Sequence, residues 1–117
     1  MNKERIVSDE KQRAFGITMA KGFHLTFPNG YTISTQFGGG NYCENRNMEI
    51  ERPGIDVLSN NVEIAIWDGK NNWVTRKAHK AITGKDLGEE VHGWVSIAEW
   101  KKYLDWTASK RKQKIAK

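Results

Sequence analysis

The sequence has little cysteine, little proline and no long apolar run. Cys43 is the single cysteine among 117 residues, which excludes an intramolecular disulfide and a zinc site built from several cysteines. No stretch approaches the roughly 20 apolar residues needed to cross a bilayer. The N-terminal residues MNKERIVSDEKQ also lack the apolar core of a signal peptide. We therefore expect a soluble protein that works in the cytoplasm, without a membrane partner.

Acidic residues are missing from the C-terminal end of the chain. The five cations of residues 110–117 equal the whole formal net charge of +5, so the rest of the chain is close to neutral. A groove for nucleic acid would concentrate cations on the folded body instead. We expect residues 109–117 to form a basic tail at the end of a helix, where cations favour the helix dipole. Nucleic-acid binding through that tail stays open as an alternative.

We predict a single domain over residues 1–117, because the length suits one domain and the sequence shows neither a change in composition nor an internal repeat. Residues 1–14 are highly charged and weakly periodic, which is typical of a mobile lead-in or a frayed helix. Pro53-Gly54 is a turn signal.

Residues 77–93 are polar, contain Gly84, Gly88 and Gly93, and show no clean hydrophobic period. This pattern predicts an irregular binding loop or a mobile segment.

The clearest local pattern is GFHLTFPNGYTISTQFGGGNYCENR, residues 22–46. Two runs of alternating apolar and polar residues flank Pro-Asn-Gly, which predicts a β-hairpin. A three-residue loop with its glycine in the left-handed region pairs Phe27 with Tyr31 and Leu25 with Ile33. A two-residue loop would instead split the two apolar rows onto opposite faces. The sequence therefore favours the three-residue loop.

Two further elements complete the predicted fold. Residues 62–67 alternate as a strand, residues 68–72 are turn formers, and residues 73–75 resume the extended pattern, which predicts a second hairpin. Near the C-terminus, Ser96 and Glu99 have the spacing of a capping box.

Four apolar residues then recur at helical spacing: Ile97, Trp100, Leu104 and Ala108. We expect an α+β fold, in which a small antiparallel β-sheet of two hairpins carries a C-terminal amphipathic helix.

The loop after the first hairpin is the best candidate for a ligand site. Three successive glycines at a strand end let backbone N–H groups converge on an anion. The amides, the aromatic ring and the guanidinium that follow suit a base and a phosphate. A flexible connection in which Arg46 merely pairs with Glu44 or Glu49 is the structural alternative. The loop lacks the Gly-Lys-Ser/Thr ending of a phosphate-binding P-loop.

The chain contains five tryptophans, a high number for its length, and we expect most of them in the core. Trp73 follows a polar loop and precedes Arg76, so it could form the wall of a nucleobase site. A core or dimer contact is the alternative for Trp73. Trp94 is expected to pack at the start of the C-terminal helix. The predicted ligand-binding residues are Gly38, Gly39, Gly40, Asn41, Tyr42, Asn45, Arg46, Trp73 and Arg76.

No arrangement of catalytic residues accompanies this site. Cys43 could act as a nucleophile only with a nearby base, and nothing in the sequence fixes His24, His79 or His92 beside it. The histidines also match no metal-ligand spacing. We therefore predict that the protein is not an enzyme and uses no cofactor or metal.

The block of residues 22–46 resembles a recurrent block in small proteins of tailed phages and prophages. Those proteins are similar further along the chain too, at VEIAIWDGKNNWV and HGWVS, so the resemblance covers about residues 20–107. The chain is also similar in size and in general architecture to the phage anti-Thoeris sponges. Those proteins oligomerise and sequester cyclic ADP-ribose-type signals without cleaving them. That similarity implies a homo-oligomer and base and phosphate contacts from Tyr42, Arg46, Trp73 and Arg76.

From the loop and this resemblance, we predict a phage-encoded counter-defence protein that sequesters a small phosphorylated, cyclic nucleotide signal in the host cytoplasm. One alternative is an inhibitor that binds a host defence protein, as anti-CRISPR proteins do. The other is nucleic-acid binding through the basic tail.

Overall fold

A computed structural model describes residues 14–19, 21–49 and 56–113, so the predictions for residues 1–13, Pro53-Gly54 and residues 114–117 lie outside the described chain. The elements in chain order are β1 (Phe15–Thr18), β2 (Gly22–Thr26), β3 (Thr32–Gln36), β4 (Asn61–Trp67), α1 (Thr75–Thr83), β5 (His92–Ser96) and α2 (Ile97–Ser109). The strands form one antiparallel sheet in the order β1-β2-β3-β4-β5. The predicted α+β class is confirmed.

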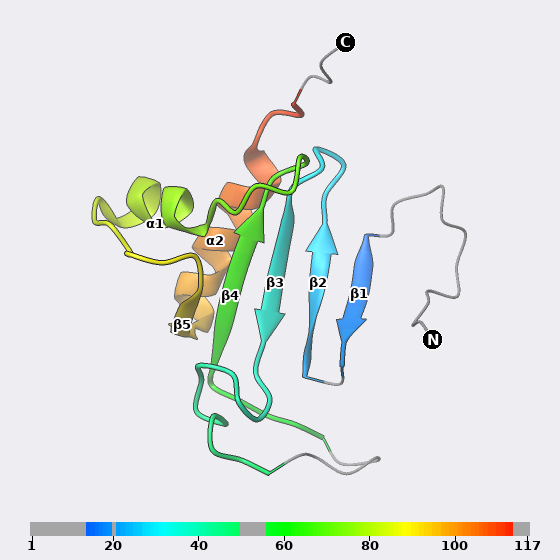
Figure 1. Cartoon of the computed structure of the whole chain (residues 1–117), viewed down its shortest axis with the longest axis vertical. Coiled ribbons are helices and arrows are strands. Elements are labelled where there is room, and N and C mark those ends of the chain that lie inside the picture. Colours follow the sequence, from blue (N-terminus) through cyan, green and yellow to red (C-terminus); the bar gives the residue numbers. More distant parts are fainter. Residues whose placement is uncertain (1–13, 20, 50–55, 114–117) are drawn as a thin grey trace.

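The two helices cover only part of one sheet face. Helix α2 packs on β3, β4 and β5, and α1 packs on β4 and α2, whereas β1 and β2 extend beyond both helices (Figure 1). The core lies between the sheet and the helices, because apolar side chains of β3, β4 and β5 alternate onto that face. Its buried residues are Ile33, Ile64, Ile66, Val74, Ala78, Val95 and Tyr103. Neither α1 nor α2, the two helices of the described residues, lies on the other face of the sheet, and we call it the open face.

The hairpin of β2 and β3 has the predicted register. Leu25 lies opposite Ile33. The Phe27 N–H donates to the Tyr31 carbonyl oxygen at 2.9 Å, and Gly30, with φ of +90°, occupies the left-handed region. The three-residue loop is therefore confirmed.

Asn29 anchors the tip of this hairpin to the end of α2. Its side-chain oxygen accepts the Tyr31 N–H at 2.9 Å. Its amide nitrogen donates to the carbonyl oxygens of Thr107 at 3.0 Å and Lys110 at 2.8 Å. These carbonyls lie at the helix end, where no further turn supplies a donor. One asparagine therefore serves both the turn and the helix terminus.

The predicted second hairpin is replaced by a helix. Trp73 forms a single bridge with Trp67, and α1 then begins at Thr75. The predicted strand at residues 73–75 is therefore wrong at its end. The prediction that residues 77–93 are irregular is wrong as far as Thr83, where α1 ends. The buried Thr75 explains the change. Its hydroxyl oxygen accepts the Ile66 N–H at 2.8 Å and so replaces the backbone partner that a continuing strand would supply.

The capping box of α2 is confirmed, but its predicted apolar stripe is partly wrong. Glu99 N–H donates to the Ser96 hydroxyl oxygen at 3.2 Å, and Ser96 N–H donates to the Glu99 carboxylate at 2.9 Å. The buried positions of α2 are Tyr103 and Thr107, while Ile97 is 73% exposed. Thr107 is buried without penalty because its hydroxyl donates to the Tyr103 carbonyl oxygen at 2.7 Å.

Candidate functional site

The glycine loop closes on itself. The Gly38 N–H donates to the Asn41 side-chain oxygen at 2.9 Å, and the Gly40 N–H donates to the Arg46 carbonyl oxygen at 2.9 Å. Gly39 is buried so closely that an added Cβ would lie 2.5 Å from the Met48 carbonyl oxygen. Two of the three amides are therefore used inside the loop, and the three do not converge on an external anion.

A carboxylate of the protein already occupies the loop. The two carboxylate oxygens of Glu63, on β4, accept hydrogen bonds from the Asn41 side-chain amide and from the Tyr42 N–H, both at 3.0 Å. Asn45, which is 7% exposed, donates from its amide nitrogen to the carbonyl oxygens of Phe37 at 2.8 Å and Leu58 at 2.9 Å. Asn45 therefore ties the loop to the chain on both sides of it. Sequence reasoning missed Glu63, since a glutamate on an alternating strand carries no special signal.

Tyr42 and Arg46 contact each other, and Tyr42 also packs on Trp94, which was not predicted to belong to the site. The Arg46 guanidinium lies 4.6 Å from the centre of the Tyr42 ring, and that ring stacks on Trp94 at 5.7 Å with 9° between the planes. The Trp94 N–H donates to the Tyr42 carbonyl oxygen at 2.8 Å. We call this group the Arg46–Tyr42–Trp94 stack. Its indole is 53% exposed, so the prediction that Trp94 packs at the start of α2 is wrong.

Local backbone geometry turns Trp94 toward the loop. Trp94 has φ of +49°, a left-handed conformation that is costly for a bulky residue. It lies where the pairing of β4 and β5 changes register. The neighbouring Gly93 has no room for a side chain, because an added Cβ would lie 2.4 Å from the Tyr42 Cβ. The irregularity in β5 therefore accommodates the docked loop.

Arg76 and Trp73 lie apart from this stack and serve different contacts. The Arg76 guanidinium makes two hydrogen bonds to Asp86, at 3.1 and 3.0 Å, at the surface. This pairing holds the pKa of Asp86 below its usual range. Trp73 is 52% exposed and lies against Trp67, with ring centres 5.6 Å apart and planes at 44°. The predicted site is thus divided among separate places on the molecule.

The open face carries a groove that includes Trp73 and Asn41. Its volume is about 520 Å³. Its lining residues are Thr18, Met19, Lys21, Ser34, Gln36, Asn41, Trp67, Asn71 and Trp73. Ser34 and Gln36 form the floor because they alternate along β3 with residues that face the helices. We call this feature the open-face groove.

The two ends of the open-face groove carry side chains of different chemistry, aromatic at one end and polar or cationic at the other. Trp67 lies opposite Thr32 in the pairing of β3 with β4, and Gln36 lies opposite Glu63, four residues further along. At the rise of a β-strand this separation is roughly 13 Å. The indoles of Trp67 and Trp73 therefore lie toward one end, whereas Gln36 and Lys21 lie toward the other.

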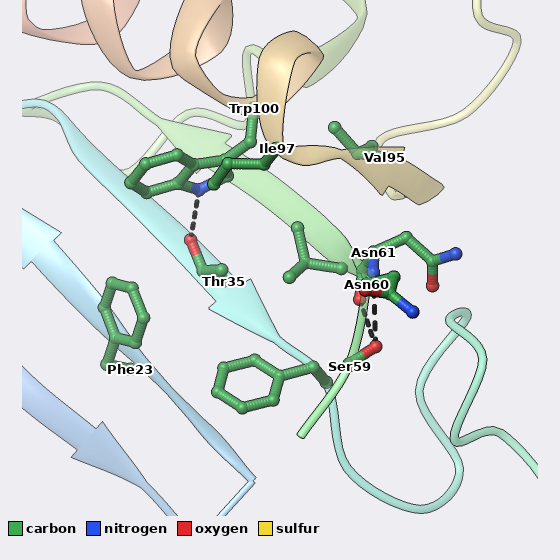
Figure 2. A pocket seen from close by; sticks show the side chains of 10 residues that line it. Phe23, Thr35, Ser59, Asn60, Asn61, Val95, Ile97 and Trp100 are labelled. Carbon is green, nitrogen blue, oxygen red and sulfur yellow. Dashed lines mark hydrogen bonds between the residues drawn. The ribbon is translucent and has the colours of Figure 1, made fainter. Parts of the chain in front are cut away.

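The helix side of the sheet carries a smaller, apolar pocket of about 160 Å³. Figure 2 shows Trp100 and Ile97 above it and Phe23 across from them. The Trp100 indole N–H donates to the Thr35 hydroxyl oxygen at 2.9 Å, which fixes the ring. Small-molecule sites usually measure about 300–1,000 Å³, so this pocket is too small to be the main ligand site.

The other candidate residues lie in structural positions. Cys43 is 1% exposed and free, as expected of a small buried apolar residue. His79 and His92 form an edge-to-face pair at 5.0 Å beside Tyr103. Burial, and then the neighbouring His79, lower the pKa of His92. Within residues 14–19, 21–49 and 56–113, no three His, Cys, Asp or Glu side chains gather as a metal site.

The first residues of the basic tail fold back onto the body. The Lys110 ammonium lies 4.4 Å from the centre of the Trp106 ring. The Gln113 side chain donates to the Asp68 carboxylate at 3.1 Å and accepts the Gly69 N–H at 3.1 Å. No helix in the described part of the chain is both long enough and apolar enough to span a membrane.

Comparison with family models, curated proteins and solved structures finds no match to this chain.

Proposed function

We propose that the protein binds a small phosphorylated nucleotide in the open-face groove and releases it unchanged. The observation that carries this proposal is the pairing, in one groove, of two indoles toward one end with a lysine toward the other. The volume of about 520 Å³ is in the range of small-molecule sites, about 300–1,000 Å³. A nucleotide has the matching order of groups, with a flat base, a polar sugar and a terminal anion.

The indole end suits the base. Trp73 is half exposed, and its tilt of 44° against Trp67 means that the two rings do not cover each other as a parallel stack would. A base that stacks on an exposed indole gains about 1–3 kcal/mol. The side-chain amide of Asn71 lies at the same end of the lining and offers hydrogen bonds to a base edge.

The lysine end suits the phosphate, and its charge limits the ligand. Lys21 is the cation in the lining. The Glu63 carboxylate accepts a hydrogen bond from Asn41 of the same lining. Glu63 lies opposite Gln36, so its charge offsets that of Lys21. One or two phosphate groups therefore fit this end better than a long polyanion. In this proposal Lys21 takes the role that the sequence assigned to the glycine amides, Arg46 and Arg76.

The lining argues for binding without cleavage. It consists of hydroxyl, amide, thioether, indole and ammonium groups. Ser34 is the candidate nucleophile on the floor, but its hydroxyl accepts from the Gln36 amide at 3.0 Å, and an amide is not a general base. The imidazole of His24, which lies opposite Ser34, has its Nδ1 3.4 Å from the Thr18 hydroxyl oxygen. Capture without cleavage is also the activity implied by the resemblance to phage counter-defence sponges, and the counter-defence role is proposed on that resemblance.

Tryptophan fluorescence and calorimetry with a panel of linear and cyclic nucleotides test the proposal, with the unphosphorylated nucleosides as reference. We expect micromolar or tighter binding of at least one phosphorylated nucleotide and recovery of intact ligand after denaturation. Trp73→Ala should weaken binding at least tenfold, because it removes the stacking surface. Trp94→Ala removes an equally exposed indole outside the groove and should leave binding within twofold.

Lys21→Met distinguishes the two ends of the groove. It should weaken phosphorylated ligands about tenfold, by loss of one charged contact, and leave nucleoside binding unchanged. Absence of binding across the panel, or equal losses for Trp73→Ala and Trp94→Ala, would overturn the proposal. Recovery of cleaved ligand would show an enzyme instead.

A further inference from the structure

Independently of the proposed ligand, we infer that β1 is the contact surface for a second copy of this chain. In this assembly the β1 strands of two copies pair antiparallel about a two-fold axis and extend the sheet across both. The surface consists of strand-edge N–H and C=O groups, which no described residue pairs with, beside an apolar face. We call Phe15, Ile17, Phe23, Leu25 and Trp100 the β1 face.

The outer edge of β1 presents backbone groups that pair with none of the residues that the structure describes. The Thr26 N–H donates to the Ala14 carbonyl oxygen at 2.7 Å, and Gly16 pairs with His24 two residues further on. Because hydrogen-bonded pairs alternate along an antiparallel ladder, the N–H and C=O groups of Phe15 and Ile17 point away from β2. Since β1 is the first strand in the sheet order, they point toward an edge on which no strand of the described residues lies.

In the part of the chain that the structure describes, this edge is only four residues long but carries no charged side chain, proline or bulge. Single-chain β-proteins block edges with charged side chains, proline or a bulge. The sequence of β1 is Phe-Gly-Ile-Thr, with no charge and no proline, and its pairing with β2 is regular. The opposite edge differs, because β5 carries the register change and the docked loop. An edge without charge, proline or a bulge can act as a template for another strand.

The side chains beside this edge form an apolar surface that the helices do not cover. Phe15 is 76% exposed and Ile17 is 84% exposed. They lie opposite Leu25 and Phe23 of β2, so all four project on the helix side of the sheet. Together with Gly16 and Trp100 they line a groove of about 510 Å³ whose exposed surface is almost entirely apolar.

A second copy can pair with the strand edge and cover the apolar face in one arrangement. If Phe15 of each chain pairs with Ile17 of the other, the outward N–H and C=O groups of both residues form a hydrogen-bonded ladder. The side chains of Phe15 and Ile17 then lie side by side across the axis, on the same face in both copies. Gly16 falls on the axis, where strands approach most closely and no side chain interferes. The His24 ring already fills the space beside Gly16, since an added Cβ would lie 2.6 Å from it.

The surface is large enough for a specific dimer. Ile97, 73% exposed, continues the apolar surface next to Phe23 and Trp100. A large aromatic side chain buries about 150–250 Å² when fully covered. Phe15, Ile17 and Ile97 are each at least 73% exposed, so together with the half-buried side chains of the β1 face and the strand edge they offer on the order of 600 Å² per chain. Specific interfaces bury about 1,200–2,000 Å² in total from both partners. A dimer through β1 therefore lies at the lower end of the stable range.

Sedimentation velocity of the full chain from micromolar to millimolar concentration tests this inference. We expect a reversible monomer–dimer equilibrium. Ile17→Lys places a charge inside the interface and should raise the dimer dissociation constant at least tenfold. Trp94→Lys is the control, because Trp94 is also an exposed apolar residue, at 53%, but belongs to β5 at the other edge of the sheet. It should leave the equilibrium unchanged, and thermal unfolding should show that both variants are folded.

Amide hydrogen exchange locates the contact. In the dimer, exchange of the Phe15 and Ile17 amides should slow as concentration rises, while the Gly16 amide, which faces β2, should change little. A chain that stays monomeric throughout would overturn the inference, and so would a dimer that Ile17→Lys leaves intact. Protection of the Phe15 and Ile17 amides in a monomer would mean that the same chain covers the edge, which also overturns it.

Discussion

The loop of residues 38–46 and the open-face groove adjoin each other at Asn41, yet they use their polar groups in opposite ways. In the loop, the amides of Gly38 and Gly40 bond within the loop, and the Tyr42 N–H bonds to the Glu63 carboxylate. In the groove, Lys21 and the indoles of Trp67 and Trp73 line an accessible hollow. Residues whose chemistry suits a ligand can therefore be used up by the fold, and residues with weaker sequence signals can be left available.

Because the Glu63 carboxylate holds the loop, we expect its removal to have the largest effect on the stability of the protein. Glu63→Ala should lower the free energy of unfolding by about 2–3 kcal/mol, since it removes two hydrogen bonds to a charged acceptor. Urea unfolding measures the loss. Asp105→Ala breaks the exposed pair with Lys101 at 2.8 Å and should cost under about 0.5 kcal/mol. Equal costs for the two variants would mean that Glu63 does not hold the loop.

Acid should affect the indole end of the groove through Asp68. Burial raises the pKa of Asp68, but the N–H groups of Asn72 and Lys70 and the side chains of Asn72 and Gln113 outweigh it and lower the pKa to about 2. Because the folded-state pKa is lowered, the stabilisation is complete above the unfolded-state pKa of about 3.9. It is lost as the pH falls from about 4 to about 2.

We expect this loss to be on the order of 1–2 kcal/mol, and unfolding measured between pH 5 and pH 2 would show it. Asp68→Asn should flatten this part of the pH profile. A profile that is unchanged in Asp68→Asn would contradict the assignment.

The smallest effect on stability is expected at the groove itself. Lys21→Met should change the free energy of unfolding by less than about 0.5 kcal/mol, as is usual for surface substitutions, although we expect it to weaken the binding of phosphorylated ligands. The same urea series used for Glu63→Ala provides the measurement. A large stability loss in Lys21→Met would mean that the groove, like the loop, is held together by these side chains, and the contrast between the two regions would be lost.

Elements specified by neighbouring residues were predictable from the sequence. Pro28, Asn29 and Gly30 specify the hairpin loop, and the alternation on both sides selects the pairing of Leu25 with Ile33. Ser96 and Glu99 specify the start of α2 in the same way. Helix α1 was missed because Val74, at its N-cap, has no capping side chain, and because the hydroxyl that ends the strand pairing comes from Thr75 itself.

The candidate site was only partly predictable, because its residues meet partners that are distant in the chain. Tyr42 and Arg46 were chosen for aromatic and cationic character, and they do lie together, but on Trp94 of β5. Asn41 and Trp73 both line the groove, while Arg76 pairs with Asp86 instead. Lys21 carried no signal in the sequence, since a lone lysine in a turn is ordinary.

By itself the sequence determined the α+β class, the hairpin register and the start of the C-terminal helix, because turn geometry, capping and alternation act over a few residues. Only the tertiary structure decided which polar groups remain available. Glu63 meets the loop from another strand, and the helices stop short of β1. Packing across the sheet therefore determines which side chains line the open-face groove and which strand edge the described residues leave unpaired.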